Sequence, residues 1–188
     1  ITMAIGLDTG KVSPNTEYVD TGSISEAGYT INNAENKVYG RSSMIKVLEE
    51  SINTDMIFVE RLVGNNDFRE ALKRFGFGAK TGVRLPAEHA GNLKNLDNVR
   101  GDLQFFTASF GQGITATPLQ LAMAYAALAN GGVLMQPQIV DQFIKADGTI
   151  VPVESREVRR VISQEASEQI GKMLRSVVVN GHGKRADV

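Results

Sequence analysis

The chain has 188 residues and a formal net charge of -1, with 42% hydrophobic and 22% charged residues, which is the composition of one globular domain with a sizeable core. A nearly neutral charge and an aromatic content of 6% disfavour nucleic acid and anionic membrane surfaces as partners. Since cysteine is absent, disulfides, zinc-thiolate sites and thiol nucleophiles are excluded.

The first elements in chain order are a short helix and a polar, exposed segment. Residues 1–7 are expected to form a helix that stops at Gly10. Residues 13–36 are rich in Ser, Thr, Asn and Gly and contain brief alternations at 18–20 and 29–32. This pattern predicts surface loops and short strand pairs.

Two helices are predicted on either side of the tripeptide Ser51-Ile52-Asn53. The apolar positions of the first helix, from Ser43 to Glu50, share one side, and those of the second share one stripe as far as Gly64. These positions are Met44, Val47 and Leu48, then Met56, Val59 and Val63. A serine and an asparagine at such a helix break can both face one cleft, although the same residue types also cap helices.

Two more helices are predicted in the middle of the chain. A helix capped by Asn66 is expected to end at Gly76, and the sequence Thr117-Pro118-Leu119-Gln120 is a capping box that opens a helix to Asn130. In the latter helix we expect a stripe of mostly small residues to pack closely against a neighbouring backbone: Leu119, Ala122, Ala126 and Ala129.

The last third of the chain predicts a hairpin followed by a long helix. Between Val133 and Val153, the alternation at 138–144, a turn at 147–148 and the segment 149–153 indicate the two strands of the hairpin. Ser163 should cap a helix with an apolar stripe that ends at Gly181. The whole is a helix-dominated α+β chain.

Several sequence blocks occur in an order that resembles class B penicillin-binding proteins, the monofunctional transpeptidases that cross-link peptidoglycan. The blocks are Ser51–Asn53, Phe75–Gly78, Leu85–Glu88, Ser109–Gly113, Thr115–Ala122 and Asn130–Gly132. The resemblance covers nearly all of residues 1–188. It implies the helical part of the penicillin-binding transpeptidase (β-lactamase-like) fold, without most of the central sheet.

Such enzymes are similar in carrying three motifs, S-x-x-K, S-x-N and K-T/S-G. By resemblance only the S-x-N motif is present, at Ser51 and Asn53. Residues 1–188 are therefore expected to be a partial transpeptidase domain that begins after the S-x-x-K motif and ends before the catalytic K-T-G motif.

Two literal motif matches have better structural explanations. Ser43 to Lys46 spells S-x-x-K but stands too close to Ser51 for the family, so we interpret Ser43 as a helix N-cap and Lys46 as a solvent-exposed side chain. Lys80 to Gly82 spells K-T-G, but it is flanked by glycine and followed by Pro86, which suits a surface turn better than a central strand.

The resemblance implies a reaction. An activated serine attacks the carbonyl between the terminal D-alanines of a peptidoglycan stem peptide, and an amine resolves the acyl-enzyme to form a cross-link. Ser51 would carry the proton from the lysine to the departing amine, and the Asn53 amide NH₂ would bind the substrate carbonyl and fix the lysine. Because the nucleophile is missing, the isolated chain is predicted to be inactive.

The resemblance also implies partners and a location. The partners are stem peptides, β-lactam antibiotics and other cell-wall synthesis proteins. The location is the outer face of the bacterial cytoplasmic membrane, with the anchor upstream, because this chain has no apolar run of about eighteen residues. No cofactor is implied, and no metal is assigned because His89 and His182 have no partner at ligand spacing.

Two other readings of the resemblance stay open. A serine β-lactamase of the same fold is weakened by the block from Gln112 to Leu121, which looks like the synthetic enzymes. A penicillin sensor or a non-catalytic scaffold for division or elongation proteins would lack the flanking motifs in its full gene. Asp55 also departs from the family, which commonly has a small or β-branched residue there.

Overall fold

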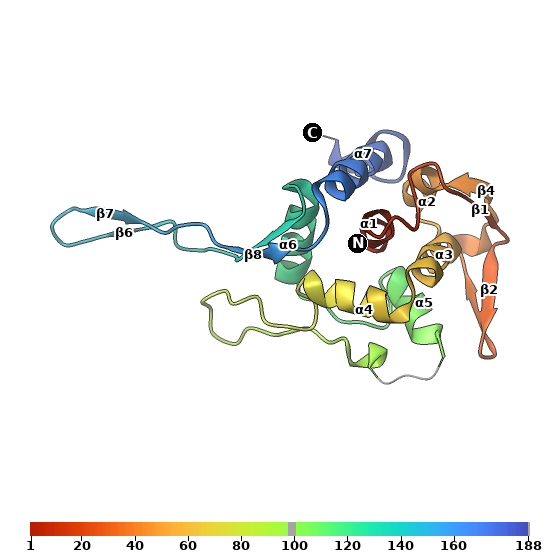
Figure 1. Ribbon diagram of the computed structural model, residues 1–188, viewed down its shortest axis with the longest axis horizontal. Helices are drawn as coiled ribbons and strands as arrows, with labels where there is room; N and C mark the ends of the chain where they lie inside the picture. Colours follow the sequence, from red (N-terminus) through yellow and green to blue (C-terminus); the bar gives the residue numbers. More distant parts are fainter. Residues whose placement is uncertain (98–100, 188) are drawn as a thin grey trace.

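A short buried helix lies at the centre of the molecule, and the other helices surround it. In the computed structural model, which describes residues 1–97 and 101–187, α1 (Thr2–Asp8) is enclosed by helices on several sides (Figure 1). Every residue from Thr2 to Leu7 is buried. Gly6 lets α3 (Asn53–Val63) approach, because a Cβ there would lie 2.6 Å from the Val59 side chain.

The surrounding helices bury apolar side chains in the hydrophobic core that also contains α1. They are α2 (Met44–Glu50), α3 (Asn53–Val63), α4 (Asn65–Arg74), α5 (Leu103–Ser109), α6 (Pro118–Ala129) and α7 (Gln164–Asn180), with short 3-10 turns η1 (Ala34–Asn36), η2 (Lys94–Leu96) and η3 (Lys184–Ala186). The predicted stripes on both sides of Ser51 are confirmed, because Met44, Val47, Val59 and Val63 are all buried.

The strands of the described residues form antiparallel pairs rather than one large sheet. The pairs are β1 (Glu17–Asp20) with β4 (Gly40–Ser43), β2 (Ser23–Glu26) with β3 (Tyr29–Asn32), β5 (Val133–Met135) with β8 (Glu157–Arg160), and β6 (Gln142–Ile144) with β7 (Ile150–Pro152). In β2–β3 the side chain of Ile24 is opposite Ile31, and in β6–β7 Phe143 is opposite Val151. The helix-dominated α+β class is confirmed.

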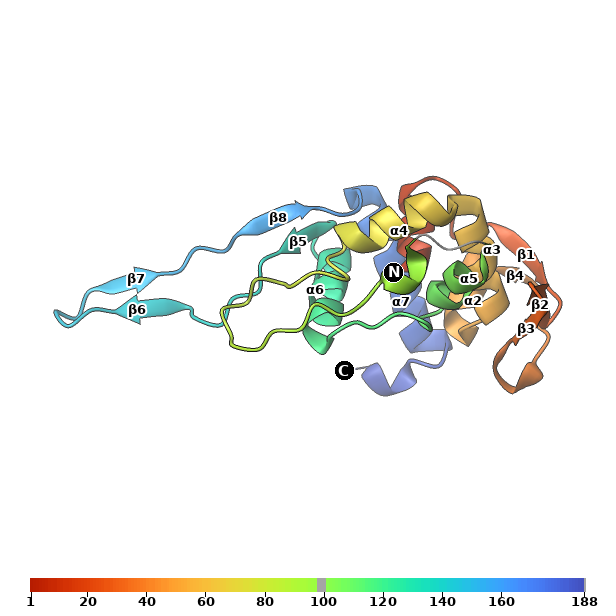
Figure 2. The same cartoon turned by 90° about the horizontal axis from the view of Figure 1, so that it is seen from below.

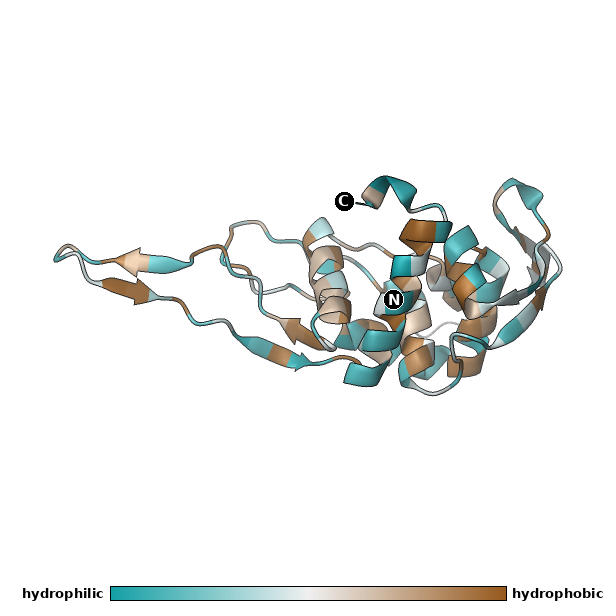
Figure 3. Cartoon of the chain, turned by 90° about the horizontal axis from the view of Figure 1, so that it is seen from above, coloured by the Kyte–Doolittle hydropathy of each residue, from teal (hydrophilic) through white to brown (hydrophobic). Residues whose placement is uncertain are grey.

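The β6–β7 hairpin is the tip of an arm that projects from the helical body (Figure 2). The β5–β8 pair joins this arm to α6 and α7. The predicted turn is confirmed, because Gly148 has a φ of 83° and the Thr149 amide donates to Asp147 Oδ1 at 2.9 Å. Apolar segments on the arm (Figure 3) include the exposed Phe143 and Ile144.

The predicted cap of α4 is wrong. The helix begins at Asn65, with Gly64 at the cap position, and Asn66 lies inside the first turn, where its Oδ1 accepts from Arg69. Gly64 has a φ of 87°, a backbone conformation that glycine adopts without a Cβ penalty. It therefore turns the chain directly from α3 into α4 and leaves no room for a separate capping residue.

The buried face of α6 also differs from the prediction. Ala122, Ala126 and Ala129 are exposed, while the buried residues are Gln120, Ala124, Ala127 and Leu128. Gln120 lies on the buried side, and its Nε2 shares its two hydrogens among the carbonyl oxygens of residues 76, 79 and 90, at 3.2, 2.7 and 2.7 Å. The stripe is predicted from apolar positions alone, so a buried glutamine on the other side of the helix is not considered.

Candidate functional site

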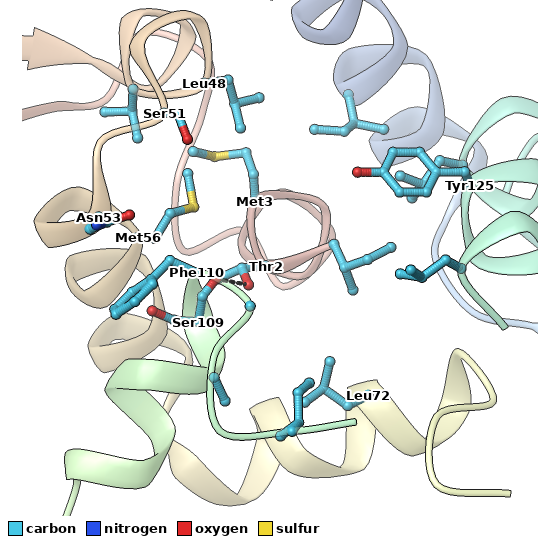
Figure 4. Close-up of a pocket in the computed structure, with 18 of the residues that line it drawn as sticks. Thr2, Met3, Leu48, Ser51, Asn53, Met56, Leu72, Ser109, Phe110 and Tyr125 are labelled. Carbon is cyan, nitrogen blue, oxygen red and sulfur yellow. Dashed lines mark hydrogen bonds between the residues drawn. The ribbon is translucent and has the colours of Figure 1, made fainter. Parts of the chain in front are cut away.

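The junction between α2 and α3 carries both predicted site residues. Helix α2 ends at Ser51, Ile52 is fully buried, and Asn53 begins α3. Ser51 and Asn53 both line one cavity of about 470 Å³ (Figure 4). The predicted break between two buried helices is present, and the structure brings the two side chains to the same cavity.

The backbone at Ser51 is strained. Its φ of 56° and ψ of 51° are left-handed, a region that costs a residue with a Cβ about 1 kcal/mol. The side chain is exposed, and within residues 1–97 and 101–187 no group hydrogen-bonds to its hydroxyl. Left-handed residues commonly end helices, and here the conformation ends α2 and leaves the hydroxyl uncommitted, so that it can both donate and accept a proton.

Asn53 is oriented by one hydrogen bond. Its Nδ2 donates to the Asn32 carbonyl oxygen at 3.2 Å, and only the NH₂ end of the amide can face a carbonyl. The amide oxygen is turned toward the cavity (Figure 4). One hydrogen of the NH₂ group is therefore committed to the protein, and the oxygen is available as an acceptor.

The rest of the cavity wall is mainly apolar, with a few polar groups. Thr2 Oγ1 donates to the Ser109 carbonyl oxygen at 2.6 Å, a bond that ties the start of α1 to the end of α5. Met3, Leu48, Phe110 and Tyr125 add apolar surface. An apolar cavity with a few placed polar groups is typical of binding sites for small molecules.

Sequence reasoning placed Ser109 and Phe110 in a block of the family resemblance but gave no function to Thr2 or Tyr125. These two residues reach the cavity only because α1 and α6 pack side by side with α7. No local signal in the chain indicates this.

Two acidic side chains of α3, the helix that Asn53 begins, are buried. Burial raises the pKa of Asp55 to about 7, with a further rise from the nearby Asp20 carboxylate and an opposing hydrogen bond from Thr54. Burial likewise raises the pKa of Glu60 to about 7. Within the described residues, Asp55 Oδ2 and both Glu60 carboxyl oxygens have no hydrogen-bond partner, so each group holds its proton to a higher pH than an exposed carboxyl group does.

The two literal motif matches are structural, as predicted. Ser43 is the N-cap of α2 and accepts from the Lys46 amide at 3.4 Å, while Lys46 Nζ lies 2.7 Å from Glu50 Oε1. Residues 80–82 form no strand, and the Thr81 amide and hydroxyl both donate to Glu88 Oε1 at 2.5 Å.

The C-terminal end of α7 rests on α2. His182 is exposed, as expected, but it has an acidic neighbour that its sequence context does not indicate, because its Nε2 lies 3.5 Å from Glu50 Oε2. The Glu49 carboxylate also accepts from Ser176 at 2.5 Å. The last turn of α2, which leads into Ser51, is thus held from the side by α7.

Comparison with known proteins places the chain in one family. The family model described as penicillin binding protein transpeptidase domain matches residues 1–188, and the chain belongs to this family. It is 35% identical over 178 residues to penicillin-binding protein PbpB of Mycolicibacterium smegmatis, covering 95% of this chain and 27% of that protein. It is 32% identical over 197 residues to stage V sporulation protein D of Bacillus subtilis, covering 100% of this chain and 29% of that protein. The chain thus spans less than a third of the length of these relatives.

Solved structures show the same fold. Penicillin-binding protein 3 of Mycobacterium tuberculosis, solved in complex with ampicillin, has a TM-score of 0.86 and 30% identity, covering 94% of this chain and 39% of that chain. The complex of the same protein with aztreonam has a TM-score of 0.85, with 30% identity and the same coverage of both chains. The D,D-transpeptidase domain from Eggerthella lenta, at 23% identity, has a TM-score of 0.87 over 100% of this chain and 48% of that chain. The chain therefore folds as part of the penicillin-binding transpeptidase fold.

Proposed function

We propose that this chain is the helical part of a serine-type peptidoglycan D,D-transpeptidase, in which Ser51 relays a proton and Asn53 holds the reacting groups. The observation that carries the proposal is the position of Ser51 and Asn53 on one cavity, with a strained backbone and an uncommitted hydroxyl at Ser51. The relatives named PbpB and stage V sporulation protein D support the family assignment.

In the proposed reaction, the oxygen of an activated serine forms a bond to the carbonyl carbon between two terminal D-alanines. The C–N bond then breaks, and the departing amine receives the proton that the serine lost. Ser51 would pass this proton from a lysine base to the amine, since a hydroxyl can accept one proton while it donates another. An amine of a second stem peptide would then displace the serine and form the cross-link.

Asn53 would act from the other side of the junction. Its oxygen faces the cavity, where it can accept from the lysine ammonium, and the second hydrogen of its NH₂ group can bind a substrate carbonyl. We further propose that the nucleophilic serine, the lysine and the catalytic K-T-G segment belong to parts of the parent protein outside residues 1–188. The isolated chain then has a relay without a nucleophile.

β-Lactam antibiotics are the proposed inhibitors, because they present a strained amide to the same serine. The ampicillin and aztreonam complexes of the Mycobacterium tuberculosis protein support this point. We propose that the parent protein acts at the outer face of the cytoplasmic membrane, with other cell-wall synthesis proteins. Among the described residues, no helix is both long and apolar enough to cross a bilayer.

Intact-mass spectrometry after incubation with benzylpenicillin tests the proposal. The isolated chain and the full-length parent protein are treated side by side. We expect a penicilloyl adduct on the full-length protein only. An adduct on the isolated chain would show that Ser43 or Ser51 is itself the nucleophile, and the absence of an adduct on either protein would favour a non-catalytic scaffold.

A further inference from the structure

A buried polar cluster lies directly behind Asn53 and joins α3 to the strand segment that precedes α2. Its members are Asp20 at the end of β1, Asn33 after β3, and Thr54 in the first turn of α3. Their exposed fractions are 1%, 4% and 1%, respectively. Polar groups buried to this extent are costly unless they are hydrogen-bonded.

Hydrogen bonds link the three residues in a ring. Thr54 Oγ1 donates to Asp20 Oδ1 at 2.6 Å, and Asn33 Nδ2 donates to Asp20 Oδ2 at 3.0 Å. The Thr54 amide donates to Asn33 Oδ1 at 3.1 Å. The first turn of α3 is therefore bound through both its backbone and a side chain.

Asp20 remains a carboxylate in this buried place. Burial by itself raises the pKa of Asp20, but the hydrogen bonds from Thr54, from the amides of Tyr39 and Gly22, and from Asn33 together lower it below its ordinary value. Hydrogen bonds to a charged acceptor are shorter and stronger than those between neutral groups. The cluster is thus a firm connection between β1, the segment after β3, and α3.

The cluster holds the two parts of the chain that determine the position of Asn53. Thr54 is its neighbour in the chain, and Asn32, the neighbour of Asn33, provides the carbonyl that accepts from Asn53 Nδ2. One side of the cluster therefore sets the backbone of Asn53 and the other sets the rotation of its amide. A shift in either would move the amide oxygen that faces the cavity.

We propose that Asp20, Asn33 and Thr54 are positioning residues for Asn53, and that they set the rate at which the nucleophilic serine is acylated. The inference rests on the proposed function, because it concerns the same site. None of the three residues lines the cavity, so each would act through Asn53 and without touching the substrate.

The decisive variant is Thr54→Val in the full-length parent protein, because valine keeps the shape of threonine and removes the hydroxyl. Acylation is followed with a fluorescent penicillin. We expect T54V to lower the second-order acylation rate constant about 10- to 100-fold, an effect of misplacement at a catalytic group. Thr54→Ser, which retains the hydroxyl, should stay within about 3-fold of the unsubstituted protein, on the same reasoning.

The variant Ser167→Ala is the control for a loss of acylation that results only from a less stable fold. Ser167 is also buried and does not line the cavity, and its hydroxyl donates to the backbone carbonyl oxygen of Leu128 at 2.6 Å, between α7 and α6. S167A should lower the thermal midpoint as T54V does and leave acylation unchanged. If the two variants lose acylation in parallel, the positioning role is overturned.

A double-mutant cycle with Asn53→Ala separates positioning from other effects. If Thr54 acts through Asn53, then T54V adds no further loss of acylation in the N53A protein. Losses that multiply would overturn the inference. The proposed function fails separately, because in that case the unsubstituted full-length protein forms no adduct at all.

Discussion

Replacing Ser51 by glycine should stabilise the domain while it removes the proposed relay. The left-handed conformation at Ser51, with a φ of 56°, costs about 1 kcal/mol for a residue with a Cβ, and glycine adopts it without that cost. Within the described residues, the Ser51 hydroxyl makes no hydrogen bond that the substitution would remove. We therefore expect S51G to raise the free energy of unfolding by about 1 kcal/mol and the thermal midpoint of the transpeptidase domain by about 2–4 °C.

Ser51→Ala is the matched control. Alanine also lacks the hydroxyl but retains a Cβ in the left-handed conformation, so S51A should unfold within about 0.5 kcal/mol of the unsubstituted protein. Urea unfolding and benzylpenicillin acylation are measured on all three full-length proteins, and both variants should lose acylation. Equal stability of S51G and S51A would refute the strain argument, whereas acylation of S51G at the unsubstituted rate would refute the relay.

Three further predictions concern residues around the site. Ser43→Ala removes the N-cap of α2 and should cost about 1 kcal/mol in urea unfolding without slowing acylation; a loss of acylation would reinstate Ser43 and Lys46 as the S-x-x-K motif. Gln120→Leu leaves the carbonyl oxygens at 76, 79 and 90 without their donor and should cost about 1–3 kcal/mol; unchanged urea unfolding would contradict that role. Because Asp55 binds its proton with a pKa of about 7 in the fold against 3.8 ordinarily, the folded state holds more protons than the unfolded state between these values. The contribution of Asp55 to stability therefore falls as pH rises through this window; Asp55→Asn should flatten the dependence and stabilise the domain at pH about 8, and an unchanged slope in thermal scans would show that Asp55 is not the titrating group.

The sequence predicts much of the fold where local patterns determine the structure. The stripes of α2 and α3, the capping box at Thr117 and the turn at 147–148 depend on residues a few positions apart, and all are present in the structure. The junction at Ser51 follows from the same patterns, because two helices with a polar break between them must turn there.

The remaining features depend on contacts between distant parts of the chain. The buried face of α6 includes Gln120, whose bonds join residues 30 to 44 positions apart. Helix α5 follows Asp102, whose side chain makes no capping hydrogen bond, and Phe105 and Phe106 of this helix are buried against other elements of the fold. The cluster of Asp20, Asn33 and Thr54 combines three ordinary polar residues of the sequence, and only the fold shows that they meet.

The projecting β6–β7 arm makes this domain suitable for a reporter group. The tip at Asp147 and Gly148 is exposed and lies outside the lining of the Ser51 cavity, and exposed loop tips accept insertions better than packed elements do. A short peptide tag or a single cysteine for dye labelling at this turn would leave the helices around α1 undisturbed. Fluorescence anisotropy from such a label would then report on the tumbling of the parent protein while the Ser51 cavity remains unlabelled.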